Sequence, residues 1–211
     1  MFQALRAGVL ALALVSTASA ALAQQNLVTN PEFDEDAVGW QGVQDFMSIA
    51  FDSDDVDGDE ESGSGLASFN PTIELDTLGQ VANDCIEGVI PGNTYTASTS
   101  FRIPTGQERT GSAGVRVAWF TSDDCSGVVS AFGIGASSGA EGAWFDLTPV
   151  ELVAPGNAGS AEMRLTIDKP QVGGTLVVFF DDATLLPEPA LETSAIAAFS
   201  VLVALRRSPR R

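Results

Sequence analysis

Histidine is absent from all 211 residues of the chain. Serine proteases and their relatives, Cys-His dyads and the usual zinc sites all need an imidazole, so the sequence excludes these kinds of chemistry. The remaining catalytic option is a pair of carboxylates, as in glycosidases. The acidic residues lie mostly among turn residues, and none stands alone in an apolar stretch that would raise its pKa. We therefore expect a protein that is not an enzyme, with a carboxylate glycosidase as the one catalytic alternative.

Basic residues are also scarce, with 10 Lys and Arg against 28 Asp and Glu and a net charge of −18. Half of the basic residues lie in the terminal segments: Arg6, Arg206, Arg207, Arg210 and Arg211. The segment between them therefore has a strongly acidic surface, which repels nucleic acid and anionic lipid headgroups. We expect no nucleic-acid partner, and surroundings that are saline or contain calcium.

Cysteine occurs only twice, at Cys85 and Cys125. In an exported chain an even pair of cysteines favours a disulfide, here closing a loop of about 40 residues. Two buried free thiols are the alternative.

The N-terminus has the pattern of a cleavable export signal. Arg6 supplies a positive charge, residues 7–15 are apolar, and Ala21-Leu22-Ala23 is a cleavage motif. The sequence thus predicts a signal peptide over residues 1–23, with an uncleaved anchor as the alternative. The mature domain is expected over 24–186, a length typical of one domain.

The C-terminus carries a second tag, which begins with Pro187-Glu188-Pro189. An apolar run follows over 194–205, about 18 Å long as a helix and too short for a hydrocarbon layer of roughly 30 Å. Arg206 and Arg207 begin a basic cluster that indicates a cytoplasmic end. Residues 187–211 resemble a PEP-CTERM sorting tail, with its short apolar helix. The resemblance implies cleavage by an exosortase-type protease and release to the cell surface or matrix; the alternative is a tail that stays in the membrane as an anchor.

Between the tags, apolar and polar residues alternate over 95–103, 114–121 and 161–168, and turn signals separate these runs. A period of two predicts half-buried strands, and no long helical period is present. We predict an all-β sandwich of about eight or nine antiparallel strands.

Several motifs follow one another in the order known from one group of proteins. These are Asn26 to Asp34 with Gly39-Trp40, Ser62 to Leu66, Ile90 to Thr96, Trp144 with Pro155-Gly156, and Phe180 to Leu185. Together they resemble carbohydrate-binding modules with a jelly-roll fold, of the CBM4/9- or CBM6-like group. The resemblance implies a jelly-roll β-sandwich, no catalysis and an extracellular polysaccharide as partner.

The same resemblance implies a structural Ca²⁺ between the first and last strands, with Asp34 and Asp181 or Asp182 as ligands. Carboxylates suit Ca²⁺, which would also offset their mutual repulsion. The alternative is that these aspartates are solvated strand ends. A separate acidic run over 52–61 has residues at EF-hand-like offsets but Ser64 at the twelfth position. We interpret it as a solvated loop, with a weak calcium site as the alternative.

Jelly-roll strand order predicts that segments near 65–69, 94–103, 113–121 and 161–168 share one sheet. Their apolar face would be core: Tyr95, Phe101, Val115, Val117, Trp119, Met163, Leu165 and Ile167. Their other face would bind a glycan through Arg102, Arg116, Phe120, Glu162 and Arg164. Cross-strand charge pairing is the alternative for this face. All three tryptophans, Trp40, Trp119 and Trp144, are expected in the core.

The sequence thus predicts an exported, surface-sorted carbohydrate-binding module. The alternative is a structural or adhesive matrix protein without a sugar ligand.

Overall fold

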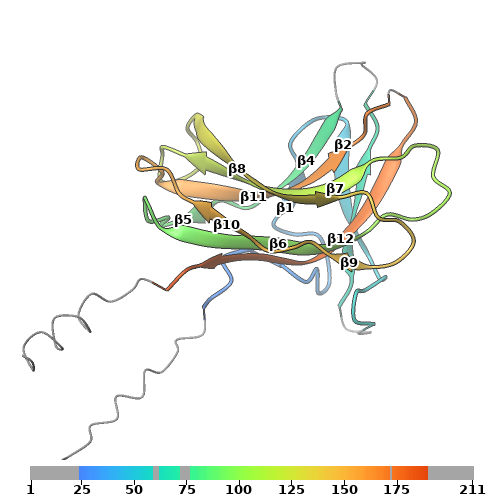
Figure 1. The fold of residues 1–211 in the computed structure, drawn as a ribbon, viewed down its shortest axis with the longest axis horizontal. Helices are drawn as coiled ribbons and strands as arrows, with labels where there is room; N and C mark the ends of the chain where they lie inside the picture. The colour runs from blue at the N-terminus through green and yellow to red at the C-terminus, as the bar shows by residue number, and fades with distance from the viewer. Residues whose placement is uncertain (1–23, 59–61, 72–76, 172, 190–211) are drawn as a thin grey trace, which may run out of the picture.

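The computed structural model describes residues 24–58, 62–71, 77–171 and 173–189 (Figure 1). The predicted signal peptide, the apolar run and the arginine cluster lie outside these residues. Within the described part of the chain, no helix has the length and apolar character needed to cross a bilayer.

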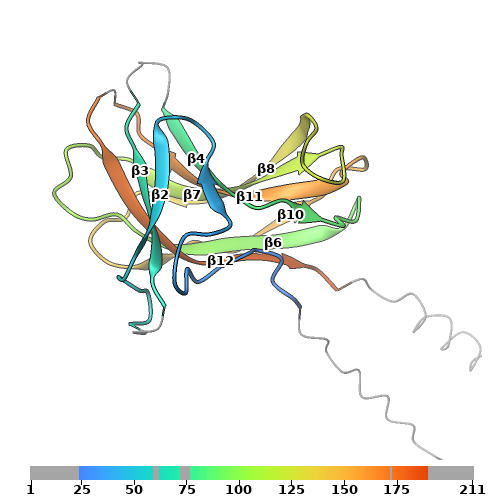
Figure 2. The same cartoon turned by 180° about the vertical axis from the view of Figure 1, so that it is seen from behind.

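Two antiparallel sheets pack face to face, which confirms the predicted all-β sandwich (Figures 1 and 2). Sheet A has the order β1 (Trp40–Gly42), β4 (Leu78–Asn83), β11 (Ser160–Asp168), β7 (Ser112–Phe120) and β8 (Val129–Ser138), with β5 (Ile86–Glu87) also on β11. Sheet B has the order β10 (Val150–Val153), β6 (Thr94–Arg102), β12 (Leu176–Pro187), β3 (Ser64–Phe69) and β2 (Met47–Asp52), with β9 (Phe145–Asp146) also on β6.

The alternating segments form the central strands β6, β7 and β11, as predicted. All eight apolar side chains that the alternation assigned to the core are buried. Period-two alternation works here because each strand has one face on the other sheet and one face outward.

The predicted grouping of strands is wrong. The segments near 65–69 and 94–103 are β3 and β6 of sheet B, whereas those near 113–121 and 161–168 are β7 and β11 of sheet A. Alternation shows which side chains point inward but does not specify the strand partner. The described residues also form twelve strands rather than eight or nine, partly because β1, β5 and β9 are very short.

Cys85 and Cys125 form a disulfide, as predicted. It joins the residue before β5 to the turn after β7, across a sequence separation of 40. In the chain-entropy description such a loop closure stabilises the fold by roughly 3–4 kcal/mol.

The described ends of the chain lie side by side (Figures 1 and 2). The Gln24 side chain donates a hydrogen bond to the Pro187 carbonyl. Strand β12 runs through Pro187, one residue beyond the predicted end of the domain, and the Glu188 amide donates to the Thr94 carbonyl. The first two residues of the Pro-Glu-Pro motif therefore continue the last strand of sheet B.

Candidate functional sites

The outer face of sheet A collects charged and aromatic side chains from neighbouring strands. Register pairs Arg164 of β11 directly with Arg116 of β7, and Arg116 with Ile134 of β8. Cross-strand partners lie on the same face of a sheet. Arg116, Glu162 and Arg164 are therefore brought together on one face, as predicted.

Arg164 is held in place by side chains on both sides. Its Nε and Nη2 donate to the same Glu162 carboxylate oxygen at 3.1 and 2.7 Å. Its Nη1 donates to the Gln80 side-chain oxygen of β4 at 3.0 Å. The guanidinium also lies 5.5 Å from the centre of the Phe132 ring. Glu162, Gln80 and Phe132 thus orient Arg164, which is only 8% exposed.

The exposed aromatic ring of this face is Phe132, whose side chain is 45% exposed. Phe120, the predicted aromatic, is buried with 4% exposure and presents no ring for stacking; the register of β7 against β8 also shifts between Trp119 and Phe120. Sequence reasoning missed Phe132 because β8 is rich in Gly and Ser. The alternation of Phe132 and Ile134 with glycines was the available signal.

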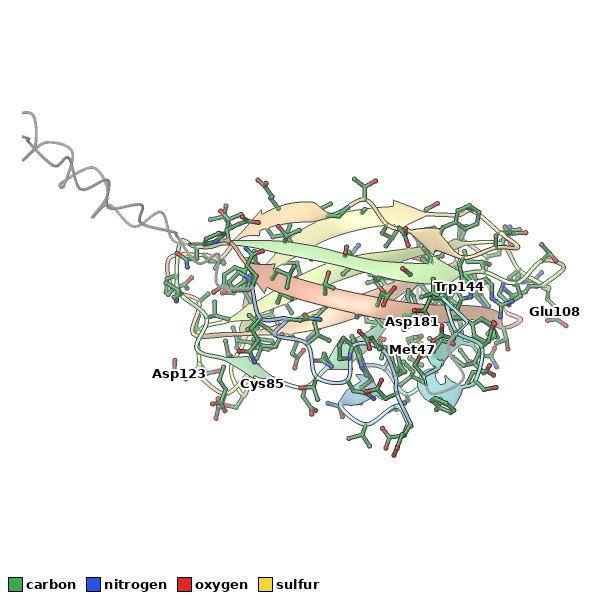
Figure 3. The ribbon with its side chains drawn as sticks, turned by 90° about the horizontal axis from the view of Figure 1, so that it is seen from below. Met47, Cys85, Glu108, Asp123, Trp144 and Asp181 are labelled. Atoms are coloured by element: carbon green, nitrogen blue, oxygen red, sulfur yellow. A yellow bond between two sulfur atoms is a disulfide. The ribbon has the colours of Figure 1, made fainter. Side chains whose placement is uncertain are left out.

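Arg102 does not belong to this face, so the prediction that all five ligand-binding residues share one face is wrong. It ends β6 in sheet B, where it pairs with Phe179 of β12. Its guanidinium lies 4.4 Å from the Phe179 ring centre and 5.7 Å from that of Trp144. It also forms an ion pair with Asp54. The position of Trp144 beside sheet B is visible in Figure 3.

Trp144 is half-buried on this outer side, so its assignment to the core was wrong, whereas Trp40 and Trp119 are buried as predicted. The Trp144 and Phe179 rings meet edge to face with centroids 6.5 Å apart, and Arg102 packs against both of them.

A second collection of charges is the acidic hollow, a cavity of about 620 Å³. It is lined by Glu32, Asp34, Glu35, Asp55, Val56, Asp57, Ser62, Asp181 and Asp182. Three segments far apart in sequence supply these residues: the opening motif, the acidic run with Ser62 after it, and the middle of β12. The structure therefore brings the predicted ligands Asp34, Asp181 and Asp182 together with the acidic run, which the sequence analysis treated as a separate loop.

A β-bulge places Asp181 in the hollow. The pairing of β12 with β6 shifts between Asp181 and Thr184, and Asp182 takes a left-handed φ of 49°. Asp181 is 1% exposed, and its two carboxylate oxygens accept the amides of Val56 and Asp182 at 3.3 and 2.8 Å. Figure 3 shows Asp181 at sheet B, near Trp144.

Burial, together with repulsion from the carboxylates of Asp182 and Asp55, raises the pKa of Asp181 to about 7 despite the lowering effect of the two amides. Burial also raises the pKa values of Asp182 and Glu32, with repulsion from Asp55 and Asp34 respectively adding to the shift. In the sequence no acidic residue stands alone in an apolar stretch, yet the fold gives three acidic residues surroundings that raise their pKa. The bulge buries Asp181 inside an acidic cluster, which local sequence does not reveal.

The hollow has the donor chemistry of a Ca²⁺ site, because carboxylates from three segments face one space without a basic side chain in its lining. Among the described residues, however, no three acidic side chains are arranged so that they could hold one metal ion. Among the described residues that line the hollow there is no aromatic and no basic side chain.

Comparison with known proteins identifies the architecture. No protein-family profile matches the chain, and no curated protein sequence matches it. Solved structures do match. The C-terminal family 22 carbohydrate-binding module of Clostridium thermocellum xylanase 10B superposes with a TM-score of 0.53 at 14% identity, over 79% of this chain and 98% of that one. The fold is the jelly-roll sandwich of carbohydrate-binding modules.

Larger proteins contain the same jelly roll as one part. A structure of the N-terminal CBM22-1 and GH10 modules of the same xylanase 10B, complexed with xylohexaose, gives a TM-score of 0.54 at 16% identity. The enzymatically active domain of bacteriophage CBA120 tailspike protein 4 gives 0.56 at 15% identity. This jelly roll covers 79% and 77% of the present chain but spans only 29% and 21% of those two structures. Jelly rolls of this kind thus occur both as separate modules and as parts of enzymes.

Proposed function

We propose that this jelly roll is a non-catalytic carbohydrate-binding module, and that it binds an extracellular polysaccharide on the outer face of sheet A. The observation that carries the proposal is the cluster of Arg116, Arg164, Glu162, Gln80 and Phe132 on that face. An oriented guanidinium and an amide offer directional hydrogen bonds to hydroxyl groups, and the exposed ring offers a surface on which a pyranose can stack.

Sheet B supports the proposal less well. Its aromatic pair already packs against Arg102, and Arg102 is neutralised by Asp54. We therefore assign the glycan to sheet A and treat sheet B as the comparison surface.

The test is a glycan array probed with the purified full chain, with its disulfide formed. Saturable binding that Phe132→Ala weakens by at least about fivefold supports the proposal, since loss of one stacking platform costs roughly 1 kcal/mol or more. Phe145→Ala is the matched control, because Phe145 is a similarly exposed phenylalanine on β9 of the other sheet. Absence of binding by a folded protein would instead favour the structural or adhesive matrix protein.

We also propose that Ca²⁺ occupies the acidic hollow and stabilises the fold. Asp34, Asp181 and Asp182 would supply carboxylates after a movement of their side chains, because they are not arranged around one point in this structure, and the charge of the ion would offset their repulsion. The support is the buried carboxylate of Asp181, which has two amides but no cationic partner among the described residues.

Finally, we propose export through residues 1–23 and surface sorting by an exosortase-type protease through residues 187–211. The disulfide agrees with an oxidising compartment. Mass spectrometry of the mature protein tests both processing steps: termini near Gln24 and near the Pro-Glu-Pro motif are expected, and an intact C-terminal mass would indicate a membrane anchor instead.

A further inference from the structure

Arg116 differs from every other basic side chain in the described part of the chain. Arg164 is bonded to Glu162 and Gln80, and Arg102 is paired with Asp54. Arg109 donates to the Gly173 carbonyl, and Lys169 donates to the carbonyls of Gly173 and Gly174. The Arg116 side chain has no hydrogen bond, ion pair or ring contact with any described residue, although its backbone pairs with β11 and β8. In a protein with a large excess of acidic residues, this guanidinium is left without a counter-charge.

The position of Arg116 explains why no acid neutralises it. Its cross-strand neighbours are Arg164 on β11 and Ile134 on β8. Its neighbours two residues away on the same face of β7 are Gly114 and Ala118. Like charges directly opposite each other on a sheet are destabilising, so this pair of arginines costs stability unless an anion lies between or beside them.

The nearest carboxylate on this face, that of Glu162, is already engaged with Arg164 at 2.7 Å. Both side chains of that ion pair are mostly buried, which holds the pair in one geometry. The two arginines and one glutamate leave this part of the face with a local charge of +1. The acidic residues elsewhere in the protein repel an anion that approaches this face, but this repulsion is screened beyond about 8 Å at physiological ionic strength. A direct contact between the anion and Arg116 is not screened in this way.

We propose that the glycan on sheet A is anionic, and that Arg116 binds its acidic group, a uronate carboxylate or a sulfate ester. This inference rests on the proposed glycan-binding function and adds the charge of the ligand. The planar guanidinium fork matches a carboxylate or a tetrahedral oxyanion through two parallel hydrogen bonds. Arg164 is held in place by Glu162 and Gln80, and its two remaining N–H groups can donate to the neighbouring sugar, while Phe132 provides the surface for stacking.

The test measures affinity of the full chain for three oligosaccharides of equal length and linkage: a neutral one, one with a single carboxylate and one with a single sulfate. We expect an anionic probe to bind about tenfold more tightly than the neutral probe, as for one charge-assisted contact at a partly exposed site. The preference should weaken with added salt. The carboxylate and sulfate probes together identify which acidic group is recognised.

Arg116→Gln should reduce the ratio of anionic to neutral affinity to about one, and Arg116→Lys should leave an intermediate ratio because the charge stays and the fork is lost. Arg109→Gln, which removes an arginine remote from this face, should keep the full ratio. Circular dichroism spectra that match the parent protein establish that each variant is folded.

Different outcomes would refute glycan binding and the preference for an anionic glycan. Equal affinity for neutral and anionic probes would refute the anionic ligand and leave the carbohydrate-binding function in place. A preference that survives Arg116→Gln would refute the role of Arg116. Absence of binding to all three probes, after an array without hits, would overturn both proposals.

Discussion

The outer face of sheet A and the acidic hollow both gather like charges, but they do so in different ways. On sheet A the arginines stand on the middle of two long strands, and Glu162 and Gln80 orient one of them. In the hollow the carboxylates come from two loops and a β-bulge, and no basic side chain lines the space. The sheet face is therefore organised without a ligand, whereas the hollow retains unbalanced charge.

The unfavourable electrostatic energy of like charges therefore has different consequences at the two sites. In the hollow the cost appears as raised pKa values, because protonation is the available way to remove charge from a buried carboxylate. On sheet A the cost is confined to Arg116, since guanidinium groups do not lose their proton. Protonation or a bound cation can reduce the repulsion between carboxylates in the hollow. A bound anion can reduce the repulsion between the arginines on sheet A.

The largest expected effect concerns Asp181. Its pKa is about 7 in the folded protein and 3.8 in the unfolded reference, so the folded state binds the proton more tightly. The free energy of unfolding should therefore fall as pH rises from about 4 to about 7, by on the order of 3 kcal/mol, and stay low above that range. Urea titrations in a chelator measure the slope. Asp181→Asn should flatten most of it.

Asp124→Asn is the matched control for that experiment. Asp124 is an exposed aspartate whose pKa is lowered by hydrogen bonds from Ser126, so its titration lies below this pH window. If the free energy of unfolding of the parent protein depended on pH as weakly as that of Asp181→Asn, Asp181 would not be desolvated in solution.

The next effect concerns Ca²⁺. An ion that binds only the folded state at a concentration one hundred times its dissociation constant adds about 2.7 kcal/mol of stability. In a domain of this size we expect a rise in Tm of roughly 5–10 °C at neutral pH. Differential scanning calorimetry with Ca²⁺ and with chelator measures it, and Asp34→Asn with Asp182→Asn should remove the rise. An unchanged Tm in the parent protein would contradict the proposed calcium site.

A smaller effect is expected from Arg164→Gln. The substitution leaves the Glu162 carboxylate partly buried without its bidentate partner, which should lower the free energy of unfolding by about 1–3 kcal/mol. Guanidinium titration measures the loss. A double substitution with Glu162→Gln should recover part of it, and strictly additive losses would show that the two side chains are not coupled.

The smallest effect is expected from Arg116→Gln. Because the Arg116 side chain bonds to no described residue and faces another arginine, its removal should change stability by less than about 0.5 kcal/mol or raise it slightly. The same titration compares it directly with Arg164→Gln. A loss as large as that of Arg164→Gln would mean that Arg116 has a structural partner, and would weaken the case for a ligand.

Sequence alone predicted the elements in which local pattern and burial agree. Strands β6, β7 and β11 and their inward side chains follow from period-two alternation, and the Cys85–Cys125 disulfide follows from the even pair in a chain whose sequence predicts export. Arg116, Glu162 and Arg164 were placed together for the same reason, since they stand at outward positions of two such strands. Strand β8 was missed because glycine and serine weaken its pattern.

Long-range pairing decided the rest. Alternation does not specify the strand partner, so Arg102 was assigned to the wrong face, and only the fold shows that Asp54, Trp144 and Phe179 surround it. The acidic hollow arises from the same cause: a one-residue irregularity in β12 turns Asp181 into the space where two distant loops meet. Sequence determined which side of each strand faces the core, because that depends on nearest neighbours along the chain. Tertiary structure decided which charges meet, because the energy of a charge depends on neighbours in space and on its burial.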